Sequence, residues 1–298
     1  MTDQATLEDF QKPVSEPIDI YKLSKDLRNA SKLLTDSEAR YLVDGYYQIQ
    51  KSRIAASHQA GTQLKNNEPT EFLNYTSNNL EILEGQIRYA LDKYSLSRVE
   101  GKWLQSIHGV GPVIAAGLLS AVNLDKTYCV AALWRFAGLD PTLEWKKGNK
   151  RPYNAQLKTL CYKVGECFVR AKNMKGDYYG KFYNERKAIE ISKNENFDFK
   201  DQAASKLAKF NISKSTDAYE WYSKGLLPPA HIHARARRHM VKLFLSHFYM
   251  VAYFCRFGQL PALPYAIAQL GHVHIIPIPR VDMVPGLEDA FRNWRSAV

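Results

Sequence analysis

Apolar residues recur every three or four positions along most of this chain, which is the spacing of amphipathic helices. The clearest stripe predicts a helix over residues 35–63, behind a capping box formed by Thr35 and Glu38. A second stripe predicts a helix over residues 70–96. Because only a short polar loop separates the two stripes, we expect an antiparallel helical hairpin over residues 35–100.

This hairpin is too slim to contain a hydrophobic core of its own. Its apolar stripes must be covered either by the rest of the chain or by a second copy, with which the hairpin would form a coiled coil. We favour the second alternative and therefore expect a homodimer.

Further helical stretches follow the hairpin and predict one helical domain over residues 101–258. A polar, weakly periodic segment at residues 194–225 is interpreted as an insertion in this domain. Residues 1–34 form an arm with one short helix, and residues 259–298 form a proline-punctuated extension. Strand signals are slight, so we expect a mostly α fold. The helical stretches lie at residues 102–122, 129–138, 153–172, 177–194 and 228–258.

The amino-acid composition indicates the net charge of the chain and its expected cellular location. The chain of 298 residues has a formal net charge of +11. Such an excess indicates a polyanionic partner, most often nucleic acid, although a basic enzyme is the alternative. Four cysteines lack the spacing of a zinc site or a disulfide framework, and they are interpreted as core residues. Neither a signal peptide nor a membrane-spanning run is apparent, so we expect a cytoplasmic protein without membrane contact.

The stretch SIHGVGPVIAAGLLSAV, residues 106–122, fits the turn of a helix-hairpin-helix motif. Gly109 and Gly111 permit positive φ and close backbone approach, and the amides at the following helix start suit a phosphate. A compact turn that only packs two helices is an equal alternative. We expect the turn to place this helix start beside a charged loop, and we expect Gly111→Val to harm folding more than binding.

Two segments concentrate the cations. The first, residues 144–158, contains the charged loop and a helix start, with Trp145 among the charges. The second, residues 231–242, opens a long helix. No Asp or Glu occurs between Glu220 and Asp282, so we expect its counter-charge to come from a nucleic-acid backbone. The candidate RNA-binding residues are Lys146, Lys147, Lys150, Arg151, Tyr153, Asn154, Lys158, His231, His233, Arg235, Arg237, Arg238 and Lys242.

No catalytic residue, metal or cofactor is expected. His231 and His233 lack a third ligand for zinc, so we expect them to pack or to touch phosphates. Acids such as Glu84 and Glu190 are interpreted as exposed on helical faces, whereas a metal-dependent nuclease gathers its acids on strands. No P-loop, nucleophile elbow or HNH motif is apparent.

Five blocks now occur in a recognisable order: IHGVGPVIAAGLLSAV, LWRFAGLDP, GNKRPYNAQLKTLCYKVGECFVRA, YYGKFYNERK and AHIHARARRHMVKLFLSHFY. In this order they resemble the C-terminal domain of bridge-RNA-guided insertion-sequence transposases of the DEDD type, over about residues 100–255. Those transposases carry an N-terminal RuvC-like domain with four acids, where this chain has a helical hairpin. They also carry a catalytic serine before a glycine, where this chain has Trp145, Lys146 and Lys147 before Gly148.

In architecture the chain is more similar to the Tas proteins of tandem-interspaced-guide-RNA systems, whose RNA-binding domain resembles the Nop domain of box C/D RNA proteins. The resemblance implies a homodimer without a nuclease of its own. It would hold a guide RNA that pairs with target DNA, and cutting would be left to a separate nuclease. The RNA contacts would then be the segments Lys146–Lys158 and His231–Lys242.

Two alternatives stay open. One is a transposase-derived enzyme whose serine is displaced, to Ser120 or to Ser246. The other is a helix-hairpin-helix protein that binds DNA without any RNA.

Overall fold

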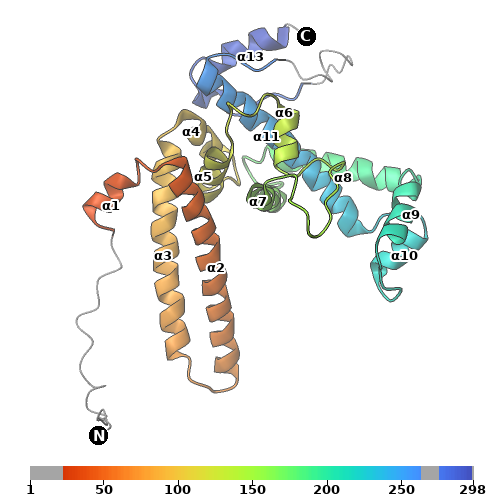
Figure 1. The fold of residues 1–298 in the computed structure, drawn as a ribbon, viewed down its shortest axis with the longest axis horizontal. Helices are drawn as coiled ribbons and strands as arrows, with labels where there is room; N and C mark the ends of the chain where they lie inside the picture. Colours follow the sequence, from red (N-terminus) through yellow and green to blue (C-terminus); the bar gives the residue numbers. More distant parts are fainter. Residues whose placement is uncertain (1–22, 263–274, 297–298) are drawn as a thin grey trace.

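The computed structural model describes residues 23–262 and 275–296, and all regular structure in these ranges is helical (Figure 1). The expectation of a mostly α fold is therefore confirmed. Residues 1–22, 263–274 and 297–298, which belong to the predicted arm and C-terminal extension, lie outside the described residues. The helices are α1 (Lys25–Ala30), α2 (Asp36–Lys65), α3 (Glu71–Leu96), α4 (Val99–Ser106), α5 (Pro112–Ala121), α6 (Val130–Phe136), α7 (Ala155–Ala171), α8 (Tyr179–Glu195), α9 (Lys200–Lys209), α10 (Asp217–Ser223), α11 (Pro229–Phe257), the 3-10 helix η2 (Val281–Met283) and α13 (Leu287–Ser296).

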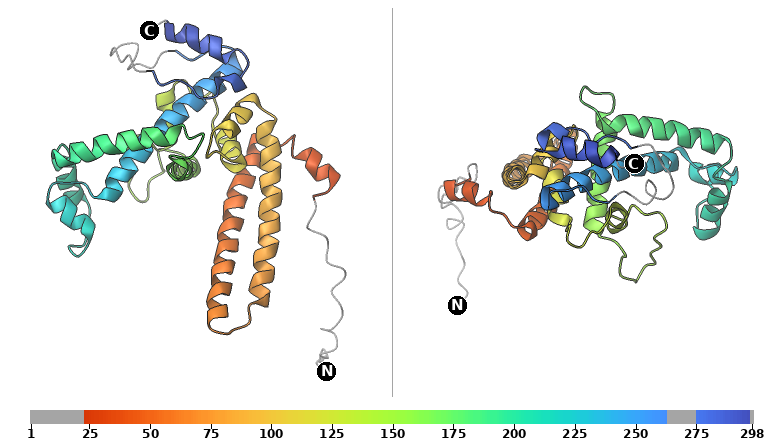
Figure 2. Two further views of the ribbon diagram at one scale, coloured as in Figure 1. Left: turned by 180° about the vertical axis from the view of Figure 1, so that it is seen from behind. Right: turned by 90° about the horizontal axis from the view of Figure 1, so that it is seen from above.

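Helices α2 and α3 form an antiparallel hairpin that extends away from the remaining helices (Figures 1 and 2). The predicted capping box starts α2. The Glu38 backbone N–H donates to Thr35 Oγ1 at 3.2 Å, and the Thr35 backbone N–H donates to Glu38 Oε2 at 2.8 Å. These bonds satisfy two amides that have no partner within the helix, so the capping signal determines where the hairpin begins.

The seam between α2 and α3 contains a buried carboxylate. Glu84 is 9% exposed and accepts hydrogen bonds from Arg53 Nε at 2.6 Å and Gln50 Nε2 at 3.0 Å. The interpretation of Glu84 as an exposed acid is therefore wrong. Its charge is tolerated there because a guanidinium and an amide from α2 replace the lost water.

The base of the hairpin packs against α5 of the same chain. Ala39 and Val43 of α2 are buried at this base, together with Leu91 and Tyr94 of α3. Of the two alternatives for covering the hairpin, packing against its own chain is thus realised at the base. Pairing with a second copy stays a prediction.

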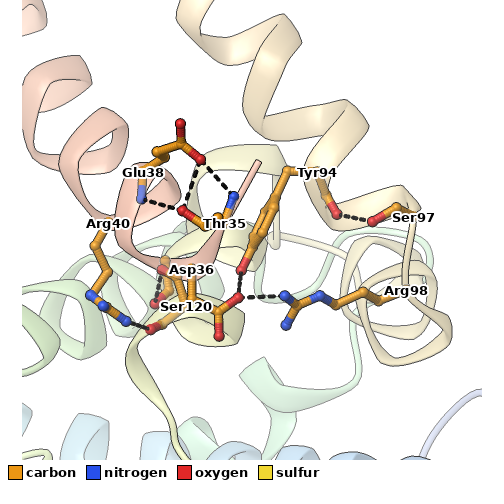
Figure 3. Close-up of polar contacts among 9 residues, drawn as sticks. Thr35, Asp36, Glu38, Arg40, Tyr94, Ser97, Arg98 and Ser120 are labelled. Carbon is orange, nitrogen blue, oxygen red and sulfur yellow. Dashed lines mark hydrogen bonds and ion pairs between the residues drawn. The ribbon is translucent and has the colours of Figure 1, made fainter. Parts of the chain in front are cut away.

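A polar cluster closes this base (Figure 3). The Tyr94 hydroxyl donates to Asp36 Oδ1 at 2.7 Å, and Arg98 pairs with the same carboxylate. Arg40 donates to the carbonyl oxygen of Ser120 at the end of α5. These contacts join the start of α2 to the end of α3 and to α5, and so they set the direction in which the hairpin leaves the body.

Helix α11 is the centre of the remaining fold, and α4, α6, α7 and α8 pack against it. Their contact is aromatic. The Phe244 ring of α11 stacks on Trp103 of α4 at a centroid distance of 6.5 Å, and it meets Phe168 of α7 edge-on at 5.1 Å. Tyr179 of α8 meets the same ring at 5.3 Å. All four rings are fully buried, and they fix the helices that carry the candidate site.

Residues 194–225, interpreted from sequence as a polar insertion, contain the two helices α9 and α10. Ala203 of α9 forms a small separate core with Leu227 and Ile232, which lie just before and within α11. Asn194 closes the segment, since its Oδ1 accepts from the Leu227 N–H at 2.8 Å and its Nδ2 donates to the Leu227 carbonyl at 3.0 Å. So small a core leaves only a weak apolar pattern, which is why the helices were not predicted.

Residues 275–296 contact α4 and α11. The Ile276 carbonyl accepts from His247 Nε2 at 3.1 Å, and the Pro279 carbonyl accepts from Trp103 Nε1 at 2.7 Å. Helix α13, which the sequence pattern did not reveal, buries its apolar face against this region. Within residues 23–262 and 275–296, no helix combines the length and apolar character that crossing a bilayer requires.

Candidate nucleic-acid interface

The two basic segments found in the sequence meet in the fold. Helix α7 packs against α11, and the loop before α7 borders a pocket of about 280 Å³ between them. Lys158 of α7 and both Arg237 and Arg238 of α11 line this pocket. The remaining lining residues are Gly138, Leu139, Asp140, Pro141, Leu143, Cys161, Tyr162, Ala234 and Val241.

The charged loop is folded around Trp145. The indole Nε1 of Trp145 donates to the Asn149 carbonyl at 2.7 Å, and the Arg151 guanidinium lies 5.2 Å from the indole centre. Gly148 has φ +96°, which lets the loop turn without strain. Three further cations have exposed side chains that make no hydrogen bond or ion pair within the described part of the chain: Lys146, Lys147 and Lys150.

The residues that follow the loop have structural contacts as well. Tyr153 packs over Gly138, where an added Cβ would lie 3.0 Å from the Tyr153 ring. Lys158 Nζ lies 4.2 Å from the centre of the same ring. Asn154 caps α7, because its Oδ1 accepts from the Leu157 N–H at 3.0 Å. The side-chain oxygen of Asn154 therefore already accepts a hydrogen bond within the chain.

Two arginines of α11 find their counter-charge within the chain. Arg235 Nε lies 2.5 Å from Oε2 of Glu190, which is 1% exposed, and Arg237 pairs with Glu166 of α7. The expectation that a nucleic acid must supply this counter-charge is therefore wrong for Arg235 and Arg237. The interpretation of Glu190 as an exposed acid is also wrong. Both acids are distant in sequence and are brought to α11 by helix packing.

Arg238 differs from its neighbours. It is half-buried and makes no hydrogen bond or ion pair with any described residue. Burial, followed by the charges of Arg235 and Arg237, lowers the pKa of Arg238. Lys242, one turn further, places its Nζ 4.4 Å from the centre of the Trp134 ring. Arg238 and Lys242 thus place positive charge near the pocket without a direct ion pair, although the charges of Glu190 and Asp140 act on them.

The histidines of α11 do not add to this charge. Burial, reinforced by nearby cations, lowers the pKa of His231 to about 4, and burial and Arg237 lower that of His233. The Tyr222 hydroxyl lies 3.2 Å from His231 Nδ1, and the Tyr183 hydroxyl lies 2.8 Å from His233 Nδ1. Both imidazoles are therefore mainly neutral at pH 7. Of their two expected roles, packing is the one that these contacts support.

The two glycines of the opening motif differ. Gly109 has φ +93°, and a Cβ there would lie 3.1 Å from the Phe168 ring. Gly111 has φ −93°, and a Cβ there would meet nothing within 4 Å. The conformational requirement therefore lies at Gly109, and the backbone of Gly111 gives no such reason for Gly111→Val to harm folding, which stays a prediction.

The start of α5 is also placed differently from the expectation. Gly109 precedes it and packs against Phe168, near the C-terminal end of α7. The charged loop precedes the N-terminal end of α7, about 20 Å away at 1.5 Å per residue. The start of α5 therefore does not lie beside the charged loop, so the two are not placed to bind the same phosphate.

Within the described ranges, the hydroxyl of neither serine considered for a displaced nucleophile contacts a basic side chain. Ser120 is 3% exposed, and its hydroxyl donates to the Gly117 carbonyl at 3.4 Å. The Ser246 hydroxyl donates to the Lys242 carbonyl at 2.9 Å. Among the described residues, no three side chains of His, Cys, Asp or Glu gather as a metal site would require.

Comparisons with known proteins add no relative. The chain matches no protein-family model, no curated protein and no solved structure. The resemblance to guide-RNA systems therefore rests on the sequence blocks alone.

Sequence reasoning missed two aromatic residues of the interface. Tyr162 lines the pocket with 54% of its surface exposed, and Trp134 carries Lys242 on its ring. A signal for Tyr162 was present, because it stands four residues after Lys158 on a predicted helix and so shares its face. No local signal indicates Trp134, since its partner comes from a distant helix.

Proposed function

We propose that the chain is a guide-RNA-binding protein for RNA-guided DNA targeting, without a nuclease of its own. The observation that carries the proposal is that Lys158 of the first basic segment and Arg238 of the second line one pocket without an ion-pair partner among the described residues. The exposed loop before α7 adds Lys146, Lys147 and Lys150, which also form no ion pair in the described part of the chain. Phosphates of an RNA backbone would supply the missing counter-charge. Sequence choice would come from pairing between RNA and DNA, as the resemblance implies.

Aromatic side chains support single-stranded RNA over duplex DNA as the ligand. Trp145 is 39% exposed and Tyr162 is 54% exposed, and both lie among the cations. Flat rings stack on unpaired bases but find no free base face in a duplex. The helix-hairpin-helix turn, which would favour duplex DNA, lies at the other end of α7.

The proposal is tested by purifying the chain from its native host and sequencing the RNA that remains bound. We expect a few short RNAs that share a common segment, as a guide array would produce. A matched pair of fourfold alanine variants provides the control. One removes Lys146, Lys147, Lys150 and Arg151 from the loop, and the other removes four exposed cations elsewhere: Lys25, Lys32, Lys51 and Lys65.

The loop variant should lose the RNA, whereas the control with the same net charge should keep it. Each phosphate contact contributes about −0.7 to the slope of log affinity against log salt for a single strand, so the loop variant should flatten that slope by about 3. Recovery of random fragments only, or equal losses in both variants, would show that the binding is non-specific and would refute the proposal.

A further inference from the structure

Arg238 is an unusual residue for a folded chain. Its neighbours Arg235 and Arg237 are each paired with an acid, but Arg238 is half-buried beside the pocket with no described hydrogen-bond partner. A guanidinium that is partly removed from water and left unpaired destabilises the free protein. Such a residue is expected where a ligand supplies the missing acceptor.

Helices α7 and α11 each place a cationic side chain in the wall of the pocket. Arg238 lies on the face of α11 that it shares with Ala234 and Val241, and Lys158 faces the same space from α7. The small side chain of Ala234 leaves room in the pocket, whereas Lys158 and the Tyr153 ring pack over Gly138. An anion in this pocket can therefore contact both helices at once.

The acids around the pocket do not cancel this charge. Glu166 is engaged by Arg237. Asp140 lines the pocket, but its carboxylate accepts the Thr142 N–H at 2.9 Å and the Thr142 hydroxyl at 2.7 Å, and these bonds lower its pKa. Among described residues, the cations that interact with Asp140 are Arg135 and Lys242. The charge of Glu190 acts on Arg238, but that carboxylate is engaged by Arg235 and Arg186, so neither Arg238 nor Lys158 forms an ion pair with a described acid.

We propose that this pocket binds one phosphate of the nucleic acid, held by paired hydrogen bonds from the Arg238 guanidinium and by the charge of Lys158. The inference rests on the proposed function. It adds hydrogen bonds of fixed direction to a surface whose exposed lysines would attract the nucleic acid only by their charge. A guanidinium presents two parallel N–H donors that match two phosphate oxygens, whereas an ammonium acts as a point charge. Replacing Arg238 by lysine should therefore weaken binding although the charge is retained.

The test measures the affinity of the full chain for short single-stranded oligouridylates by fluorescence anisotropy. We expect Arg238→Lys to weaken binding by about tenfold, the loss of one charge-assisted hydrogen bond. The matched control Arg28→Lys, on the exposed helix α1 and outside the candidate interface, should bind as the unmodified chain does. Parallel measurements with 5′-phosphorylated and 5′-hydroxyl oligonucleotides distinguish the sources of the phosphate. An equal loss for both indicates an internal phosphodiester, and a loss for the first alone indicates a terminal phosphate.

A second variant keeps the test decisive if Arg238→Lys disturbs the fold. Lys158→Ala changes an exposed side chain, and its effect should be smaller in the Arg238→Lys background than alone, because both residues contact one phosphate. Binding by Arg238→Lys that equals that of the unmodified chain, or strictly additive losses, would overturn the directed phosphate site and leave the proposed function standing. Failure of the unmodified chain to bind RNA would instead refute the proposed function.

Discussion

Arg235 belongs to the cationic run of α11, but its contacts assign it to the fold, and its removal tests that assignment. Its Nε lies 2.5 Å from Oε2 of Glu190, whose side chain is 1% exposed. Burial alone would raise the pKa of Glu190, but hydrogen bonds from Arg235 and Arg186 outweigh burial and lower it. The carboxylate is therefore charged in the folded chain, and Arg235→Ala leaves it with one partner in place of two.

The size of the effect follows from this burial. Removing one member of a buried ion pair costs about 3–5 kcal/mol, chiefly because the other charge stays buried without its partner. Arg186 keeps its own contact with Glu190 at 2.6 Å, so we expect a loss of about 3 kcal/mol in the free energy of unfolding. For a chain of this length that loss corresponds to a fall in Tm of roughly 6 °C. Arg238→Ala removes a guanidinium without an acid partner and should change the free energy by less than about 1 kcal/mol.

Urea unfolding followed by circular dichroism measures these differences. The double variant Arg235→Met with Glu190→Leu replaces the pair by apolar side chains, and it should recover most of the stability lost in Arg235→Ala. Arg186 is 31% exposed and can turn to solvent in that variant. The reasoning is refuted if Arg235→Ala unfolds at the same urea concentration as the unmodified chain, or if the double variant is no more stable than the single one.

Two further predictions concern the fold. Gly109→Ala should lower the free energy of unfolding by about 1–2 kcal/mol, because residue 109 has a positive φ and lies against the Phe168 ring, whereas Gly111→Ala should change it by less than about 1 kcal/mol. Thermal unfolding of both variants measures the difference, and equal effects would contradict the prediction. Burial lowers the pKa of His247 to about 4. The contribution of the neutral imidazole to the free energy of unfolding is therefore complete above pH 6.5, and about 3 kcal/mol of it is lost as the pH falls towards 4. His231 titrates over the same range, so urea unfolding at several pH values should show a shallower acid loss for His247→Phe, and an unchanged slope would contradict the assignment.

The helices could be predicted because their signals are local. The apolar stripe and the capping box of Thr35 and Glu38 indicated α2, whose end at Lys65 lies two residues beyond the predicted one. The charged loop and the start of α7 were indicated in the same way, by residues close together in sequence. Helix α13 was missed because its short amphipathic pattern follows several prolines, which suggested an extended segment.

The pairing of charges could not be predicted, because it depends on which helices meet. Arg237 and Glu166 are 71 positions apart, and Arg235 and Glu190 are 45 apart. A stretch of sequence without acids therefore says little about the charge of the folded surface. The same packing makes the α11 histidines neutral, although in sequence they look like part of the cationic run. Only the folded arrangement separates Arg235 and Arg237, which pair with acids of other helices, from Arg238, which forms no ion pair with a described residue.

Helix α7 also connects the hairpin to the candidate interface, and its periodicity explains how. Gln156 and Lys163 contact side chains of α2, while Lys158 and Tyr162 line the pocket beside α11. At 3.6 residues per turn, the first pair lies on one face of the helix and the second pair lies about 130° around the helix from it. One rigid element thus places the hairpin relative to the pocket beside α11. A second copy bound to the hairpin would consequently hold its own pocket at a fixed distance and orientation, as a single RNA spanning both pockets would require.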